Sequence, residues 1–171
     1  MHVPKSEANS SGAKDDHSLS GILQAALTVV VRAWYQVSMV RPCFLVVDRE
    51  YSGSISTRKL VIETAKFNVL TAYSALEAID TLTRFPTVSG VVLDAGIQGM
   101  ECGELIRKLK EIESGVPVIA ISAPGASPCE NADYQLESFE PARLLDLLRK
   151  LEPEQVAAIE ARNESLNKEN K

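Results

Sequence analysis

Polar side chains follow the short apolar runs of this chain, each at the point where its run ends. Asp48 follows CFLVV, Asp94 follows GVVL, Ser122 follows VPVIAI and Glu137 follows YQL. If these runs are strands of a parallel sheet, ligands and chemistry collect at their carboxyl ends. The residue types therefore predict a polar site centred on Asp94, with Asp48 beside it.

The apolar runs are continuous rather than alternating, which is typical of strands covered on both faces. Segments with helical spacing of apolar residues separate the runs, at 54–65, 75–83, 101–113 and 141–151. Ser74, with Glu77 three residues later, predicts a capping box at the start of the second of them. This alternation predicts an α/β fold with a doubly wound, five-stranded parallel sheet. Right-handed crossovers give the flavodoxin-like strand order 2-1-3-4-5, which brings Asp48 and Asp94 together on neighbouring strands.

The connection between the fourth and fifth strands is unusually short. Residues 123–133 read APGASPCENAD, and Pro124, Gly125 and Pro128 suppress helix formation. We expect an irregular loop here, with the fourth helix shortened or absent. Such a loop would leave apolar sheet surface uncovered.

The ends of the chain differ in composition from its middle. Residues 1–18 are polar and predict a disordered tail. Residues 19–40 are apolar and predict a helical extension that covers a surface or dimerises, unless the natural start is Met39. Arg32 and Gln24 argue against a membrane span in this stretch. Residues 41–151 form the expected domain, and residues 152–171 form a charged C-terminal tail.

Composition excludes several classes of protein. The net charge of the 171 residues is -5, which argues against nucleic acid or an anionic membrane as the main partner. Cys43, Cys102 and Cys129 form no CxxC motif, so we expect three reduced thiols in a cytoplasmic protein. Both histidines, His2 and His17, lie in the polar N-terminal tail, which disfavours a histidine-based metal or catalytic site.

Four motifs in order resemble the receiver domain of two-component response regulators. They are FLVVDRE, VVLDAGIQGMECGELIRKLK, VIAISA and DYQLESFEPARLLDLLRKL, within residues 41–151. The resemblance implies that Asp94 accepts a phosphoryl group from a histidine kinase. It also implies magnesium held by Asp48 and Asp94, because a carboxylate and a phosphoryl group repel without a cation between them. Ser122 and Tyr134 match the two family residues that change conformation when the aspartate is phosphorylated.

The chain departs from this family at the site itself. Arg49 stands at the position of the second acid and Glu137 at that of the lysine, while Ser138 and Gln98 replace prolines. Arg49 and Glu137 either form an ion pair across the pocket, with Arg49 also near Asp94, or have drifted independently. We expect weak magnesium binding and no other cofactor; Glu50 is a less favoured substitute ligand. A trans Glu137–Ser138 bond is also expected, because a cis bond without proline costs roughly 3 kcal/mol.

The leading hypothesis is an atypical, single-domain receiver in phosphorelay signalling, with Asp94 as candidate phosphoacceptor and no enzymatic output. Its partner would be a histidine kinase or another signalling protein. A homodimer could form through the N-terminal extension or the face around residues 123–151. The alternative is a slow, magnesium-dependent phosphoacceptor. A flavodoxin-like ligand binder is more remote, because DREYSGS after the first strand carries one glycine and no phosphate-binding loop.

Overall fold

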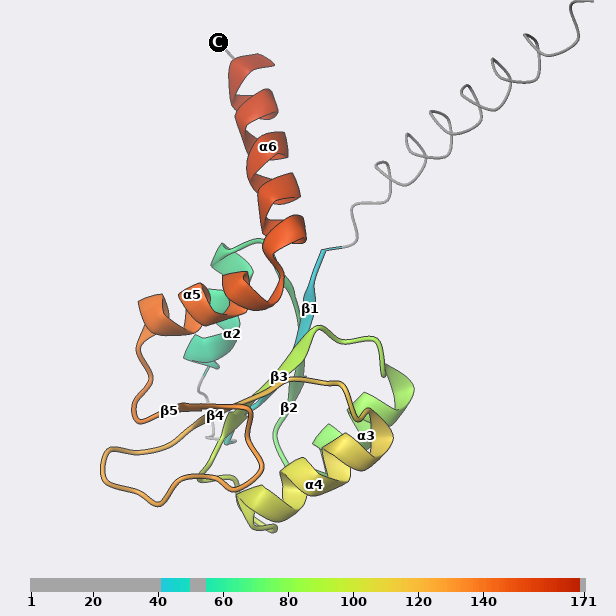
Figure 1. Cartoon of the computed structure of the whole chain (residues 1–171), viewed down its shortest axis with the longest axis vertical. Helices are drawn as coiled ribbons and strands as arrows, with labels where there is room; N and C mark the ends of the chain where they lie inside the picture. Colours follow the sequence, from blue (N-terminus) through green and yellow to red (C-terminus); the bar gives the residue numbers. More distant parts are fainter. Residues whose placement is uncertain (1–40, 50–54, 170–171) are drawn as a thin grey trace, which may run out of the picture. The chain divides into compact units, whose positions relative to one another are not determined.

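The computed structural model describes residues 41–49 and 55–169, which form one parallel sheet with helices on both faces (Figure 1). The sheet has five strands in the order β2-β1-β3-β4-β5, as predicted. The strands are β1 Cys43–Val47, β2 Asn68–Ala72, β3 Gly90–Asp94, β4 Val118–Ile121 and β5 Tyr134–Leu136. The helices are α2 Thr57–Thr64, α3 Ala75–Arg84, α4 Cys102–Ile112, α5 Pro141–Leu151 and α6 Pro153–Glu169.

Several expectations lie outside the described residues. These are the disordered tail over 1–18, the apolar extension over 19–40 with the alternative start at Met39, and the ligand role of Glu50.

The register of the sheet brings the ends of its central strands to one edge. Val47 of β1 pairs with Leu93 of β3, so Asp48, the residue after β1, lies beside Asp94, the last residue of β3. Asp94 in turn pairs with Ile121 of β4, which Ser122 follows. The predicted convergence of Asp48, Asp94 and Ser122 is therefore a consequence of strand order and register.

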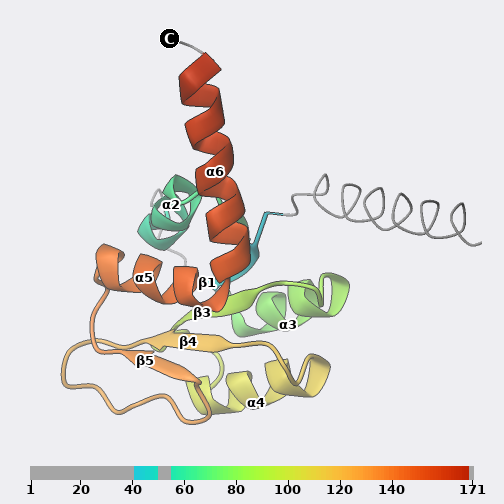
Figure 2. The same cartoon turned by 45° about the horizontal axis from the view of Figure 1, so that its top comes forward.

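Two layers of helices cover the sheet, α3 and α4 on one face and α2 and α5 on the other (Figure 2). Alternate residues of β1 point to opposite faces of the sheet. Leu45 and Val47 belong to the apolar cluster that includes Leu82 of α3 and Leu105 of α4. The intervening residue Val46 is also fully buried but lies outside that cluster. Burial of β1 and β3 on both faces explains why their sequences are continuously apolar.

Serine caps fix the starts of two helices. The Ser74 hydroxyl accepts the Glu77 N–H at 3.1 Å, as predicted, whereas the Glu77 carboxylate accepts the N–H of Tyr73, one residue before the cap, at 2.7 Å. Ser56 caps α2 by accepting the Lys59 N–H at 3.2 Å. That cap makes α2 begin at Thr57, later than the predicted Ser54, and it brings Ser56 beside the carboxyl end of β1.

The segment between β4 and β5 contains no helix across its described residues 122–133, as predicted. The expectation that this loop leaves apolar sheet surface uncovered, however, is wrong. Cys129 is 2% exposed and belongs to the core cluster on the α3/α4 face, and Ala132 packs against it. The loop therefore covers the sheet where a helix would have done so.

The charged segment that follows the sheet domain is helical in its described residues. Helix α6 follows α5 after one intervening residue and continues to Glu169, with Ile159 buried. The Glu137–Ser138 bond is trans, as predicted; none of the peptide bonds in the described part of the chain is cis. Among these residues no helix has the length and apolar character to cross a membrane.

Candidate functional site

Two buried carboxylates form the base of the site. Asp48 is 7% exposed and Asp94 4% exposed. Asp48 accepts the Arg49 backbone N–H at 2.9 Å and the Ser56 hydroxyl at 2.8 Å. Asp94 accepts the Gly96 N–H at 2.8 Å through Oδ1. Each carboxylate thus has neutral donors, but buried charges of one sign also require countercharge.

Arg58 supplies that countercharge from the first turn of α2. Its Nη1 lies 2.6 Å from Asp48 Oδ1, and its Nη2 lies 3.0 Å from Asp94 Oδ2. The side chain is 16% exposed, and the guanidinium carbon lies 5.4 Å from the centre of the Phe139 ring. The flat, forked guanidinium can bridge two carboxylates in a way that a lysine ammonium cannot. Arg58 therefore links the ends of β1 and β3.

Arg49 adds a second cation at Asp94. Its Nε donates to Asp94 Oδ2 at 3.1 Å, so two guanidiniums share that oxygen. We call the four residues Asp48, Asp94, Arg49 and Arg58 the arginine clasp. Their formal charges cancel. Gly96 leaves room for the clasp, because a Cβ at position 96 would lie 3.2 Å from Asp94 Oδ1 and 3.4 Å from the Arg49 guanidinium carbon.

Of the two alternatives for Arg49 and Glu137, the ion pair between them does not form in the structure. Among the ion pairs that join residues of the described ranges, Arg49 binds Asp94 and none involves Glu137. Glu137 follows β5, which lies two strands away from β3 in the sheet, and its side chain is exposed. The proximity of Arg49 to Asp94, expected alongside that pair, is confirmed.

Sequence reasoning missed Arg58, although one signal marks it. A cation in the first turn of a helix opposes the helix dipole, which favours an acid there. Helix α2 has no acid in its first turn and carries Arg58 at its second residue. An arginine in that unfavourable position, ten residues after Asp48, indicates a partner at the carboxyl edge of the sheet.

The remaining predicted site residues lie on β4 and β5. Ser122 is 9% exposed, and its hydroxyl has no hydrogen-bond partner among the residues that the structure describes. Its backbone N–H donates to the Leu136 carbonyl at 2.9 Å, which holds it at the edge of the sheet. Tyr134 is 38% exposed on β5. A groove of about 240 Å³ opens beside the clasp, lined by Asp48, Arg49, Ile55, Ser56, Thr57, Arg58, Tyr73 and Phe139.

The residues of the clasp do not fit a magnesium ion in this arrangement. Magnesium would need the oxygens of Asp48 and Asp94, and Arg58 bridges those oxygens with its own positive charge. Within the described ranges, no three histidine, cysteine or acidic side chains gather into a group that could hold a metal. The arginines provide the positive charge that a metal would otherwise bring.

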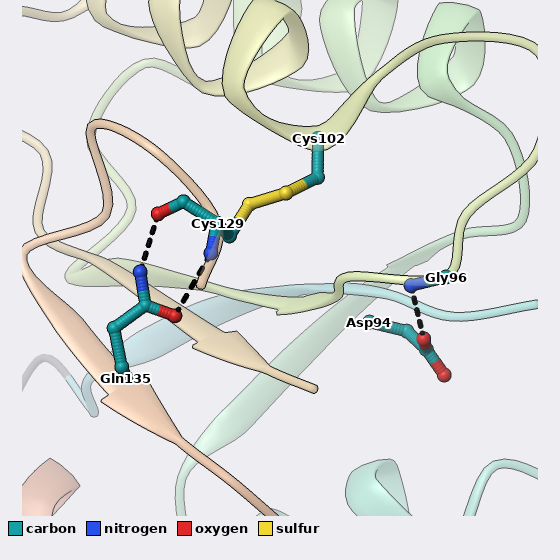
Figure 3. The surroundings of a disulfide bond; sticks show 5 residues. All are labelled: Asp94, Gly96, Cys102, Cys129 and Gln135. Carbon is teal, nitrogen blue, oxygen red and sulfur yellow. Dashed lines mark hydrogen bonds between the residues drawn. A yellow bond between two sulfur atoms is a disulfide. The ribbon is translucent and has the colours of Figure 1, made fainter. Parts of the chain in front are cut away.

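The structure corrects the expectation of three reduced thiols. Cys102 and Cys129 form a disulfide with their Cα atoms 5.8 Å apart (Figure 3). Cys43 is free, and burial raises the pKa of its thiol. The pair was not visible in the sequence because its members are 27 residues apart and meet only where the loop over 123–133 crosses the start of α4.

No protein-family model and no curated protein sequence matches the chain. Solved structures do. A response regulator receiver domain protein from Clostridium thermocellum is 22% identical and aligns with a TM-score of 0.58 over 64% of this chain and 93% of its own. The receiver domain of a sensor histidine kinase from Pseudomonas aeruginosa, with magnesium coordinated in its active-site cleft, is 16% identical, with a TM-score of 0.57 over 66% and 98%.

A third similar structure is the CheX–CheY complex with BeF3 and magnesium from Borrelia burgdorferi. It is 21% identical, with a TM-score of 0.56 over 64% of this chain and 88% of that chain. At these identities the likeness shows the fold alone, which is that of CheY-like receiver domains.

Proposed function

We propose that this chain is an atypical receiver-type signalling module that acts through a protein partner, with Asp94 as a phosphoacceptor restrained by the arginine clasp. The partner class is a histidine kinase or another signalling protein. The fold likeness supports the receiver assignment. The single observation that carries the restraint is the bridge from Arg58 to both Asp48 and Asp94.

The clasp restrains Asp94 through both of its oxygens. Oδ1 accepts the Gly96 N–H, and Oδ2 receives Arg49 and Arg58. An attacking oxygen must give up hydrogen bonds to reach a phosphorus atom, and charge-assisted bonds are the strongest to lose. After transfer, a phosphoryl group would also meet the like charge of Glu137 if that side chain turned toward it. Both effects lower the rate and extent of phosphorylation.

Incubation with acetyl phosphate and magnesium chloride tests the proposal directly. Intact-mass spectrometry detects phosphorylation as a gain of about 80 Da. We expect little adduct in the time that saturates a receiver of ordinary sequence, and none in the matched variant Asp94→Asn. Rapid, stoichiometric phosphorylation of the wild type that disappears in Asp94→Asn would refute the restraint while keeping the receiver assignment.

A slow but functional phosphoacceptor is the second candidate. The buried, unpartnered hydroxyl of Ser122 favours it, because such a donor is costly to keep without a ligand oxygen to bind. In the same assay this candidate gives an adduct that accumulates slowly, is lost in Asp94→Asn and forms more slowly still in Ser122→Ala.

A further inference from the structure

We propose that Cys102 and Cys129 are a reversible dithiol–disulfide pair, a redox modification site that fastens the loop over residues 123–133 to helix α4. The proposal concerns the thiols alone and does not depend on phosphorylation of Asp94. Its consequence is that the surface between β4 and β5 has two states set by the redox conditions.

The two cysteines lie at the junction of two elements. Cys102 is the first residue of α4 and is half-buried, whereas Cys129 is almost fully buried in the loop. Gln135 of β5 holds Cys129 from the other side: the Cys129 N–H donates to Gln135 Oε1 at 3.3 Å, and Gln135 Nε2 donates to the Cys129 carbonyl (Figure 3). Because Cys102 is the more accessible sulfur, exchange with an external thiol or disulfide begins there.

Contacts other than the disulfide keep the loop near α4. Lys110 of α4 pairs with Asp133 at 2.7 Å, and Asp133 also accepts the Val118 N–H at 2.7 Å. Burial opposes ionisation of Asp133, but the contacts with Lys110 and the Val118 N–H prevail and lower its pKa. At Gly103 the loop approaches so closely that a Cβ would lie 3.1 Å from that of Glu130. These contacts hold the thiols within reach of one another after reduction, so the bond can form again.

The first half of the loop lacks such support. All residues from 123 to 128 are exposed. Within this stretch, as the structure describes it, one backbone hydrogen bond forms, from the Ala126 N–H to the Ala123 carbonyl at 3.0 Å. The disulfide fixes Cys129 at the end of this stretch together with the Gln135 hydrogen bonds, and it is the covalent tie between the loop and α4. Reduction should therefore release residues 123–128 while the rest of the domain stays folded.

The chemistry requires a disulfide co-reactant, and glutathione disulfide serves as the probe. The Cys102 thiolate attacks one glutathione sulfur, forming a mixed disulfide and releasing one glutathione thiolate. The Cys129 thiolate then attacks the Cys102 sulfur and releases the second glutathione thiolate. The protein loses two electrons and two protons, and one glutathione disulfide becomes two glutathione thiols.

The test equilibrates the full chain in buffers of varied reduced-to-oxidised glutathione ratio, followed by acid quench, alkylation and peptide mass spectrometry. As the buffer becomes more oxidising, we expect Cys102 and Cys129 to change together from two alkylated thiols to one disulfide. The linked peptides should weigh about 2 Da less than the sum of the two free-thiol peptides, and dithiothreitol should reverse the change. Elastase cleavage after Ala126 should rise by about tenfold or more on reduction, with an unchanged circular dichroism spectrum.

Two variants keep the test decisive. Cys43→Ser removes the cysteine outside the pair and should behave as the wild type. Cys102→Ser should show the rapid cleavage in every buffer. The proposal is overturned if both thiols remain alkylated at all ratios, if the bond resists dithiothreitol in the folded protein, or if cleavage after Ala126 is equal in the two redox states.

Discussion

Replacing Arg58 by alanine removes the central cation of the clasp. Two charge-assisted hydrogen bonds are lost, each worth about 1.5–3 kcal/mol, from carboxylates that are almost fully buried. Breaking a buried ion pair costs about 3–5 kcal/mol when a charge is left uncompensated. Here Asp94 keeps Arg49 and the Gly96 N–H, and Asp48 keeps Ser56. We therefore expect a loss near the lower limit, about 3 kcal/mol in the free energy of unfolding.

Urea denaturation followed by circular dichroism measures this loss. With a slope of about 1.5 kcal/mol per molar urea, the unfolding midpoint of Arg58→Ala should fall by about 2 M. Arg49→Ala is the matched control: that side chain is 42% exposed, so its removal should cost about 1 kcal/mol or less.

Arg58→Lys should fall between the two alanine variants, since an ammonium cannot bridge both carboxylates as a guanidinium does. If Arg58→Ala costs no more than Arg49→Ala, the clasp does not hold the site together.

Three further predictions concern the loop and β4. Cys102→Ala should cost about 3.5 kcal/mol under oxidising conditions, from the loop entropy of a 27-residue separation, and much less in dithiothreitol; the difference between urea midpoints measures it. The lowered pKa of Asp133 means that its contribution to stability is complete above its ordinary value of 3.8 and is lost as the pH falls through the folded value. In Asp133→Asn the free energy of unfolding should therefore fall less steeply toward acid pH than in the wild type. An equally steep fall would contradict a stabilising contact between Asp133 and Lys110. Ser122→Ala should change the unfolding free energy by less than about 1 kcal/mol, because the lost hydroxyl is unpartnered; a larger loss in urea melts would show a hidden role in folding.

The sheet was predictable because its signals are local. Continuous apolar runs and intervening helical spacing determined the order of elements, and chain crossover rules then brought Asp48 and Asp94 to neighbouring strands. The Ser74 cap was visible for the same reason: its partner Glu77 is three residues away. The absent helix after β4 followed from Pro124 and Pro128.

The failures concern side chains that meet across long separations. Arg58 reaches Asp94 over 36 residues, and Cys102 reaches Cys129 over 27. Neither distance leaves a pattern in the sequence. The alternative that paired Arg49 with Glu137 rested on their family positions alone, whereas Arg49 binds Asp94 because the ends of β1 and β3 lie side by side.

The initial rate of Asp94 phosphorylation in Arg58→Ala, compared with that of the wild type, tests the restraint by the clasp most directly. Both proteins are incubated with acetyl phosphate and magnesium chloride, and the adduct is followed by intact mass after circular dichroism has shown that the variant is folded. We predict a faster rate in Arg58→Ala, because Asp94 Oδ2 loses one of its two guanidinium partners and the space between the carboxylates becomes free for a cation. An equal or slower rate in the folded variant would contradict the account.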